Sequence, residues 1–116
     1  MNGFSPGYKP SARPRRISEI KTADDQVQVV GLVVDKEEST LVLDDGSGSV
    51  NVLFEDPNLV EGIDVGSKVR VFGTPLNIGD THEIHATIIQ NQEGLDLDLY
   101  KEVMEKIRNF QKYIKQ

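Results

Sequence analysis

The chain offers few residues whose types and spacing suit catalysis. It has 116 residues, no Cys and two His, His82 and His85, so thiolate nucleophiles and sulfur-ligated metals are excluded. The two His lie three positions apart in a stretch expected to form a strand, where successive side chains alternate between faces, so they point in opposite directions. They cannot chelate one metal ion, and we interpret both as surface residues. The sequence predicts no enzyme, catalytic residue, metal site or cofactor.

One acidic, glycine-rich stretch, Asp44-Asp45-Gly46-Ser47-Gly48-Ser49, contains residues that could hold a cation or a phosphate. The calcium-loop pattern with its terminal Glu is absent, and no helix begins directly after the glycines to form a phosphate cradle. Apolar runs at residues 41–43 and 50–54 flank the stretch. Since Gly, Asp and Ser favour chain reversal, the pattern predicts the turn of a β-hairpin.

Residue types that bind nucleic acid are present but sparse. Single strands are held by cations along the phosphate backbone and by aromatic rings that stack on bases. The candidate nucleic-acid residues are Arg13, Arg15, Arg16, Lys36, Asn51, Phe54, Arg70 and Phe72. Phe54 has a second interpretation, because it continues the alternation of Val50 and Val52 and would then be a core residue.

The charge distribution limits how strongly the chain can bind nucleic acid. The net charge is −6, and residues 26–95 carry three bases against twelve acids, whereas residues 1–25 carry five bases against three acids. Nucleic-acid modules present a basic face. Residues 26–95 therefore cannot be strongly basic anywhere, and direct strand binding should be weak.

The elements that would position these residues follow from hydrophobic patterning. Residues 1–16 are rich in Pro and Gly and predict a disordered basic arm. Strands are expected at residues 26–34, with a bend at Gly31, and at 41–43, 50–54, 68–73 and 81–90, with a bend away at residues 74–76. Residues 57–66 suit a short plug. Five strands and a plug predict a mainly β protein, with an OB-fold barrel at residues 17–95.

Residues 96–116 predict a helix that begins near Asp96 or Asp98 as N-cap. Pairs Glu102–Lys106 and Glu105–Arg108 occupy its polar side. A helix of this length, about 30 Å, is longer than one side of a small barrel, so part of its apolar face should contact a partner. The candidate subunit-interface residues are Leu99, Tyr100, Val103, Met104, Ile107, Phe110 and Ile114.

The hairpin at residues 44–54, the strand Val69-Arg70-Val71-Phe72-Gly73 and the C-terminal helix together resemble the OB-fold subunits of replication protein A. The likeness is to the small subunits, either the archaeal smallest subunit or the core of the middle one, and covers residues 17–116. It implies that three C-terminal helices, one per subunit, bundle into a heterotrimer that binds single-stranded DNA in replication, repair and recombination. It also implies that Phe54 and Phe72 are the rings that would stack on bases.

Three functions stay open. In the first, the chain is an assembly subunit whose helix packs against two other OB-fold subunits, with weak or indirect DNA contact. In the second, it is an autonomous single-strand-binding module, and in the third an OB domain of unrelated function. The helix favours the first, because burying a large apolar side chain contributes about 1.5 to 3 kcal/mol.

The sequence also bears on location. No apolar run reaches the roughly 20 residues that span a bilayer, and no apolar signal core begins the chain. We expect an intracellular protein without membrane contact, in the cytoplasm or nucleoid if archaeal and in the nucleus if eukaryotic.

Overall fold

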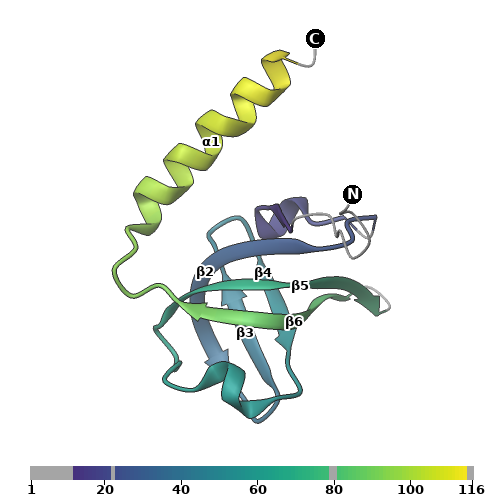
Figure 1. The fold of residues 1–116 in the computed structure, drawn as a ribbon, viewed down its shortest axis with the longest axis vertical. Helices are drawn as coiled ribbons and strands as arrows, with labels where there is room; N and C mark the ends of the chain where they lie inside the picture. The colour runs from purple at the N-terminus through teal and green to yellow at the C-terminus, as the bar shows by residue number, and fades with distance from the viewer. Residues whose placement is uncertain (1–11, 22, 79–80, 115–116) are drawn as a thin grey trace, which may run out of the picture.

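The computed structural model describes residues 12–21, 23–78 and 81–114 (Figure 1). Residues 1–11, the larger part of the predicted arm, lie outside the described residues. Within the described part of the chain, no helix is long and apolar enough to cross a membrane. In chain order the elements are β1 (Arg13–Pro14), η1 (Ile17–Glu19), β2 (Val27–Lys36), β3 (Thr40–Asp44), β4 (Ser49–Leu53), η2 (Pro57–Val60), β5 (Lys68–Ile78), β6 (Thr81–Asn91) and α1 (Leu97–Ile114).

The strands form a closed barrel. Their order is β1-β2-β3-β4-β6-β5, and β5 pairs back onto β2. The β4–β6 pair is parallel, whereas β2–β3, β3–β4, β5–β6 and β2–β5 are antiparallel. Five long strands with η2 between β4 and β5 make the predicted OB-type barrel, and the two-residue β1 adds a parallel strand beside β2. In Figure 1, α1 projects from this barrel as a single rod.

Alternate residues of the strands fill the barrel, as the period of two requires. Ile17 of η1 packs into this core, and the predicted plug contributes Val60 and Ile63, while Val65 of the same segment is exposed. Figure 1 shows η1 and η2 at opposite ends of the barrel. The strand residues of the core are Val27, Val29, Val33, Leu41, Leu43, Val50, Val52, Val69, Val71, Ile84, Ala86 and Ile89.

As predicted, β2 changes direction around Gly31. The first half of β2 pairs with β5 and the second half with β3, and Leu32 belongs to both ladders. A Cβ atom at Gly31 would lie 2.7 Å from the carbonyl oxygen of Asp44. Glycine is required here because two backbones approach closely where the strand serves both sides of the barrel.

The prediction of a bend at residues 74–76 is wrong. β5 continues to Ile78 and pairs with β6 along this length, with Pro75 opposite Ile84. The ladder between β2 and β5 ends at Gly73, so Pro75 lies where β5 has one neighbouring strand among the described residues. A proline without an N–H is tolerated at such an edge, which is why it does not end the strand.

Helix α1 begins as predicted after Asp96. The Asp96 carboxylate accepts a hydrogen bond from the backbone N–H of Leu99 at 3.0 Å, which satisfies one free donor of the first turn. The linker before it is fixed to the barrel, since Lys68 Nζ donates to the Leu95 carbonyl at 2.9 Å. The start of α1 is therefore anchored to β5.

Candidate functional site

A stripe of apolar side chains lies exposed along α1. At about 100° per residue, its members fall within an arc of roughly 80° on the helix surface. Ile114 continues the same arc, but its side chain lies outside the described residues. The exposed stripe, as we define it, consists of Leu99 (57% exposed), Val103 (46%), Ile107 (44%) and Phe110 (62%). Four large apolar side chains in one row form the most extended apolar surface of the described helix.

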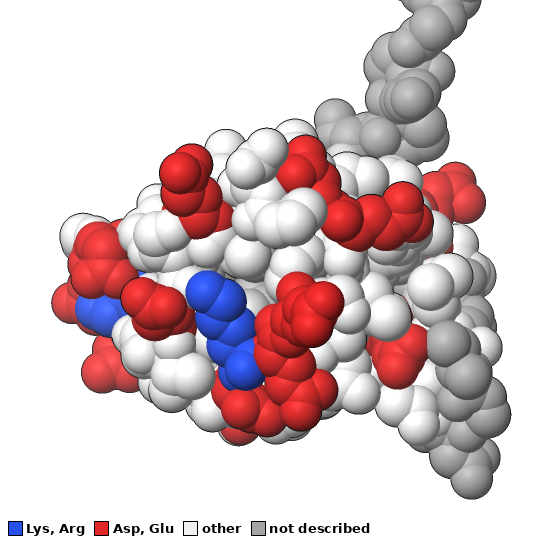
Figure 2. Space-filling model, turned by 90° about the horizontal axis from the view of Figure 1, so that it is seen from below, with Lys and Arg blue, Asp and Glu red and all other residues white. Residues whose placement is uncertain are grey.

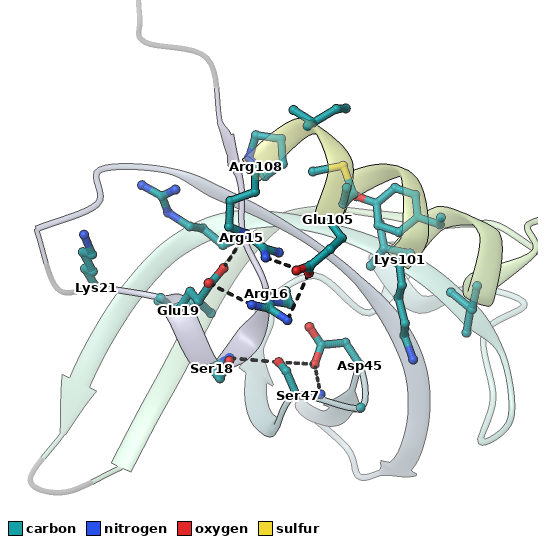
Figure 3. Close-up of a pocket in the computed structure, with 18 residues that line it drawn as sticks. Arg15, Arg16, Ser18, Glu19, Lys21, Asp45, Ser47, Lys101, Glu105 and Arg108 are labelled. Carbon is teal, nitrogen blue, oxygen red and sulfur yellow. Dashed lines mark hydrogen bonds and ion pairs between the residues drawn. The ribbon is translucent and has the colours of Figure 1, made fainter. Parts of the chain in front are cut away.

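The predicted interface residues divide between two adjoining parts of the apolar face of α1. Tyr100 and Met104 are half-buried and, with Leu97, line a groove of about 630 Å³ between α1 and the barrel (Figure 3). Val30, which points outward from β2, lies in this groove and is only 4% exposed. Burial raises the pKa of Tyr100 above its usual value of 10.0, so its phenol is neutral at physiological pH.

Four charged side chains bridge η1 and α1 across the groove. Arg16 contacts Glu19 at 3.1 Å and Glu105 at 3.6 Å, and Arg108 contacts Glu105 at 2.8 Å and Glu19 at 3.4 Å. The hydrogen bond from Arg16 holds the pKa of Glu19 below its usual value of 4.5. Figure 3 shows these side chains pointing toward one another. We call this set the ion-pair ring, and it joins η1 to α1 across the groove.

The other wall of the groove is the hairpin turn predicted from the glycine-rich stretch. Asp45 is buried, and its carboxylate accepts hydrogen bonds from the Ile17 N–H at 2.8 Å and from the Ser47 N–H at 2.8 Å and hydroxyl at 2.6 Å. Gly46 at the turn has a positive φ of 88°. These contacts join the β3–β4 turn to η1, so the stretch has a structural role, as the sequence predicted.

The three arginines assigned to the arm lie beside this groove. Arg13 is exposed on β1, and Arg15 pairs with Asp24 through two hydrogen bonds of 3.1 Å. That pairing holds the pKa of Asp24 below its usual value of 3.8. Since Arg16 belongs to the ion-pair ring, the structure brings all three to one end of the barrel and gives two of them carboxylate partners.

The remaining nucleic-acid candidates are dispersed. Lys36 is held at the opposite end, donating to the Ile63 carbonyl at 2.7 Å and pairing with Asp64 at 3.5 Å. Asn51 is half-buried on β4, and Arg70 and Phe72 are half-buried on β5. Arg70 and Phe72 share the outward face of β5, where Arg70 lies opposite Val30 of the groove, whereas Lys36 lies at the other end of the barrel, so the structure does not gather all four residues into one surface.

Phe54 is buried at 3% exposure in the barrel core. A ring in that position cannot stack on a base, so the core interpretation of Phe54 is correct and its nucleic-acid assignment is wrong. The physical reason is the alternation of side chains along the strand. Val50 and Val52 point inward, and Phe54 continues the same face.

Charge is segregated along the molecule. Figure 2, which views the η2 end of the barrel, shows acidic side chains spread over that surface with few cations between them. The exposed acids near this end are Asp35, Glu37, Glu38, Glu55, Asp56, Glu61 and Asp64. An anionic strand would be repelled from this end.

The His residues form no metal site within the described residues. His82 is exposed, and His85 Nε2 lies 3.3 Å from a carboxylate oxygen of Glu55. Among the residues that the structure describes, no three His, Cys, Asp or Glu side chains are placed to hold a metal ion. This arrangement agrees with the interpretation of both as surface residues.

Sequence patterning did not identify Val30, Lys101 or Asp45 as residues of the groove. One signal was present for Val30, because the run from Val29 to Val34 is apolar at outward as well as inward positions. An outward valine that is buried requires a covering element, and Val30 lies in the groove that η1 and α1 line. Lys101 carried no such signal, since its place depends on the angle at which the helix leaves the barrel.

No protein-family model matches the sequence, and no curated protein matches it. Among solved structures, the fold is similar to the telomere capping protein Ten1 from Saccharomyces pombe, with a TM-score of 0.69, 21% identity and coverage of 85% of this chain and 99% of that one. A chain of the S. pombe Stn1-Ten1 complex aligns with a TM-score of 0.57 and 23% identity over 77% of this chain and 72% of that one.

A third similar structure is a replication protein A heterotrimer bound to ssDNA. One of its chains aligns with a TM-score of 0.53 and 23% identity, covering 71% of this chain and 66% of that one. At these identities the similarity shows the fold alone, because OB folds serve many functions. It confirms the predicted OB fold.

Proposed function

We propose that this chain is a small, non-enzymatic OB-fold subunit of a single-stranded-DNA-binding complex, and that it joins the complex through α1. The observation that carries this proposal is the exposed stripe of Leu99, Val103, Ile107 and Phe110. A soluble monomer rarely leaves a continuous apolar row uncovered. The stripe therefore belongs to an interface.

The occupant of the stripe is a helix from another OB-fold subunit. Apolar residues in a row along one helix pack into the matching grooves of a second helix. Two copies of this chain are a poorer pair, because each carries a net charge of −6. The similarity to the Stn1-Ten1 complex and to a replication protein A heterotrimer supports a partner of the same fold.

The energetics also favour assembly over autonomous DNA binding. Complete burial of a large apolar side chain contributes about 1.5 to 3 kcal/mol, and each stripe residue retains about half of its surface for a partner to cover. Ordering and association costs reduce this total. The acidic barrel has no comparable source of affinity for phosphate.

The replication protein A heterotrimer among the similar structures supports an assembly with more than one partner subunit. We therefore propose a bundle in which α1 packs against helices from two other OB-fold subunits, serving replication or repair. The chain then contributes mainly to assembly, and its partners supply most of the affinity for DNA.

Affinity capture of the tagged full-length chain from its native source, with identification by mass spectrometry, tests this function. We expect at least one captured protein with an OB fold and a terminal helix. Val103→Asp with Phe110→Asp should abolish that capture, because two carboxylates cannot be buried in an apolar seam.

The matched control is Glu102→Asp with Asn109→Asp, which places the same residue type at the same spacing one position away from the stripe. This control should retain the partner. Capture of the same proteins by the wild type and the stripe variant would contradict the proposal. Far-UV circular dichroism confirms that both variants keep the barrel and the helix.

A further inference from the structure

We infer that single-stranded nucleic acid contacts this subunit in the groove between α1 and η1, and not on the acidic end of the barrel. The inference rests on the proposed function for the identity of the ligand, and it deepens that function by naming the contact site. Its residues differ from those of the exposed stripe, with the exception of Ile107, which borders both.

The first support is the distribution of cations. Five cations and three carboxylates line the groove, whereas acids dominate the surface at the η2 end (Figure 2). Lys36 lies at this acidic end. Among the described residues, its ammonium group pairs with Asp64 and donates a hydrogen bond to the Ile63 carbonyl. A phosphate backbone therefore approaches the η1 and α1 end more favourably.

The second support is that the groove carboxylates already have partners. Glu19 and Glu105 are paired within the ion-pair ring, and Asp45 accepts three hydrogen bonds from Ile17 and Ser47. In the described residues, Lys21 and Lys101 line the groove with no ion pair to a carboxylate. These two ammonium groups are the cations available to phosphate.

The third support is the shape and lining of the groove. Its volume of about 630 Å³ is large enough for a nucleotide-sized ligand, and its wall includes the half-buried ring of Tyr100 with Met104 and Val30 nearby. Bases stack on aromatic and apolar side chains while cations hold the backbone. In Figure 3, Lys101 extends from α1 beside the turn that carries Asp45 and Ser47.

Charge reversal at two positions of α1 tests the site. Lys101 lines the groove, whereas Lys106 lies outside it and pairs with Glu102 at 3.6 Å. Lys101→Glu and Lys106→Glu change the net charge equally on the same helix. Binding of a fluorescein-labelled oligothymidylate to the full-length chain is followed by anisotropy over a series of salt concentrations.

We expect Lys101→Glu to weaken binding about fivefold or more at low salt and to reduce the slope of log K against log salt by about 0.7, as the loss of one phosphate contact requires. Lys106→Glu should change affinity less than about twofold. Tyr100→Leu should weaken binding by about fivefold or more at every salt concentration, because it removes stacking and no charge.

Three results would overturn the inference. These are no saturable binding by the wild-type chain at low salt, equal losses for Lys101→Glu and Lys106→Glu, or a larger loss for Lys36→Glu than for Lys101→Glu. Lys101→Glu leaves the exposed stripe intact, so partner capture by this variant should persist. A negative result for nucleic-acid binding in the groove would then be distinguished from a negative result for partner assembly.

Discussion

The buried carboxylate of Asp45 accepts a hydrogen bond from the backbone N–H of Ile17 at 2.8 Å, across 28 residues of sequence. It joins the β3–β4 turn to η1, which carries two members of the ion-pair ring, Arg16 at its N-cap and Glu19. The position of the groove wall therefore depends on one side chain in a turn.

Asp45→Ala should destabilise the chain by about 1 to 3 kcal/mol, because the N–H groups of Ile17 and Ser47 lose their acceptor. The measurement is urea denaturation at neutral pH. Asp25→Ala is the matched control, since Asp25 is exposed, and it should change the free energy of unfolding by less than about 0.5 kcal/mol. Equal effects of the two substitutions would show that the Asp45 contact does not hold η1.

Gly31→Ala should destabilise the barrel by about 1 to 3 kcal/mol, because the added methyl group would meet the Asp44 carbonyl at 2.7 Å. Gly94→Ala serves as control, as nothing lies within 4 Å of a Cβ at that position. It should leave stability unchanged or raise it by up to about 1 kcal/mol. Thermal unfolding followed by circular dichroism compares the two, and a harmless Gly31→Ala would contradict the close approach of β2 and β3.

Acid should weaken the attachment of the N-terminal segment. Hydrogen bonds from Arg15 and Arg16 hold the pKa values of Asp24 and Glu19 below their usual 3.8 and 4.5. A depressed pKa in the folded state contributes stability that is complete above the unfolded value and is lost as the pH falls through the folded value. The free energy of unfolding should therefore decline below about pH 4.5.

Asp24→Asn tests this prediction, because it removes one of the two carboxyl groups. The variant should be less stable than the wild type at neutral pH, and the difference should shrink as the pH falls toward 3. Urea titrations at several pH values give the two curves. A difference that is the same at every pH would show that the charge of Asp24 plays no part.

The barrel was predictable because its interior follows the period of two. Val69 and Val71 are buried at the predicted positions, and the hairpin between β3 and β4 forms at the predicted turn. The length of β5 was not predictable, since a proline usually ends a strand. Pro75 is tolerated because β2 no longer pairs with β5 at that position. The point at which the β2–β5 ladder ends depends on the topology of the sheet, and the residues around Pro75 do not indicate it.

The candidate site was predictable in part. The periodicity of α1 identified its apolar face but not which part of that face the barrel covers, because that choice depends on the angle at the linker after β6. Tyr100 and Met104 line the groove, and Leu99 and Phe110 are exposed. The ion-pair ring joins residues about 90 positions apart, beyond the reach of any local pattern.

The most direct test of the assembly function is photo-crosslinking from the exposed stripe in the native cell. Phe110 is replaced by benzoylphenylalanine, and Asn109, one position outside the stripe, is replaced in the control. We expect a crosslink from position 110 to the helix of another OB-fold protein and none from position 109. A crosslink from position 110 only to the chain's own barrel or to a second copy would contradict the account.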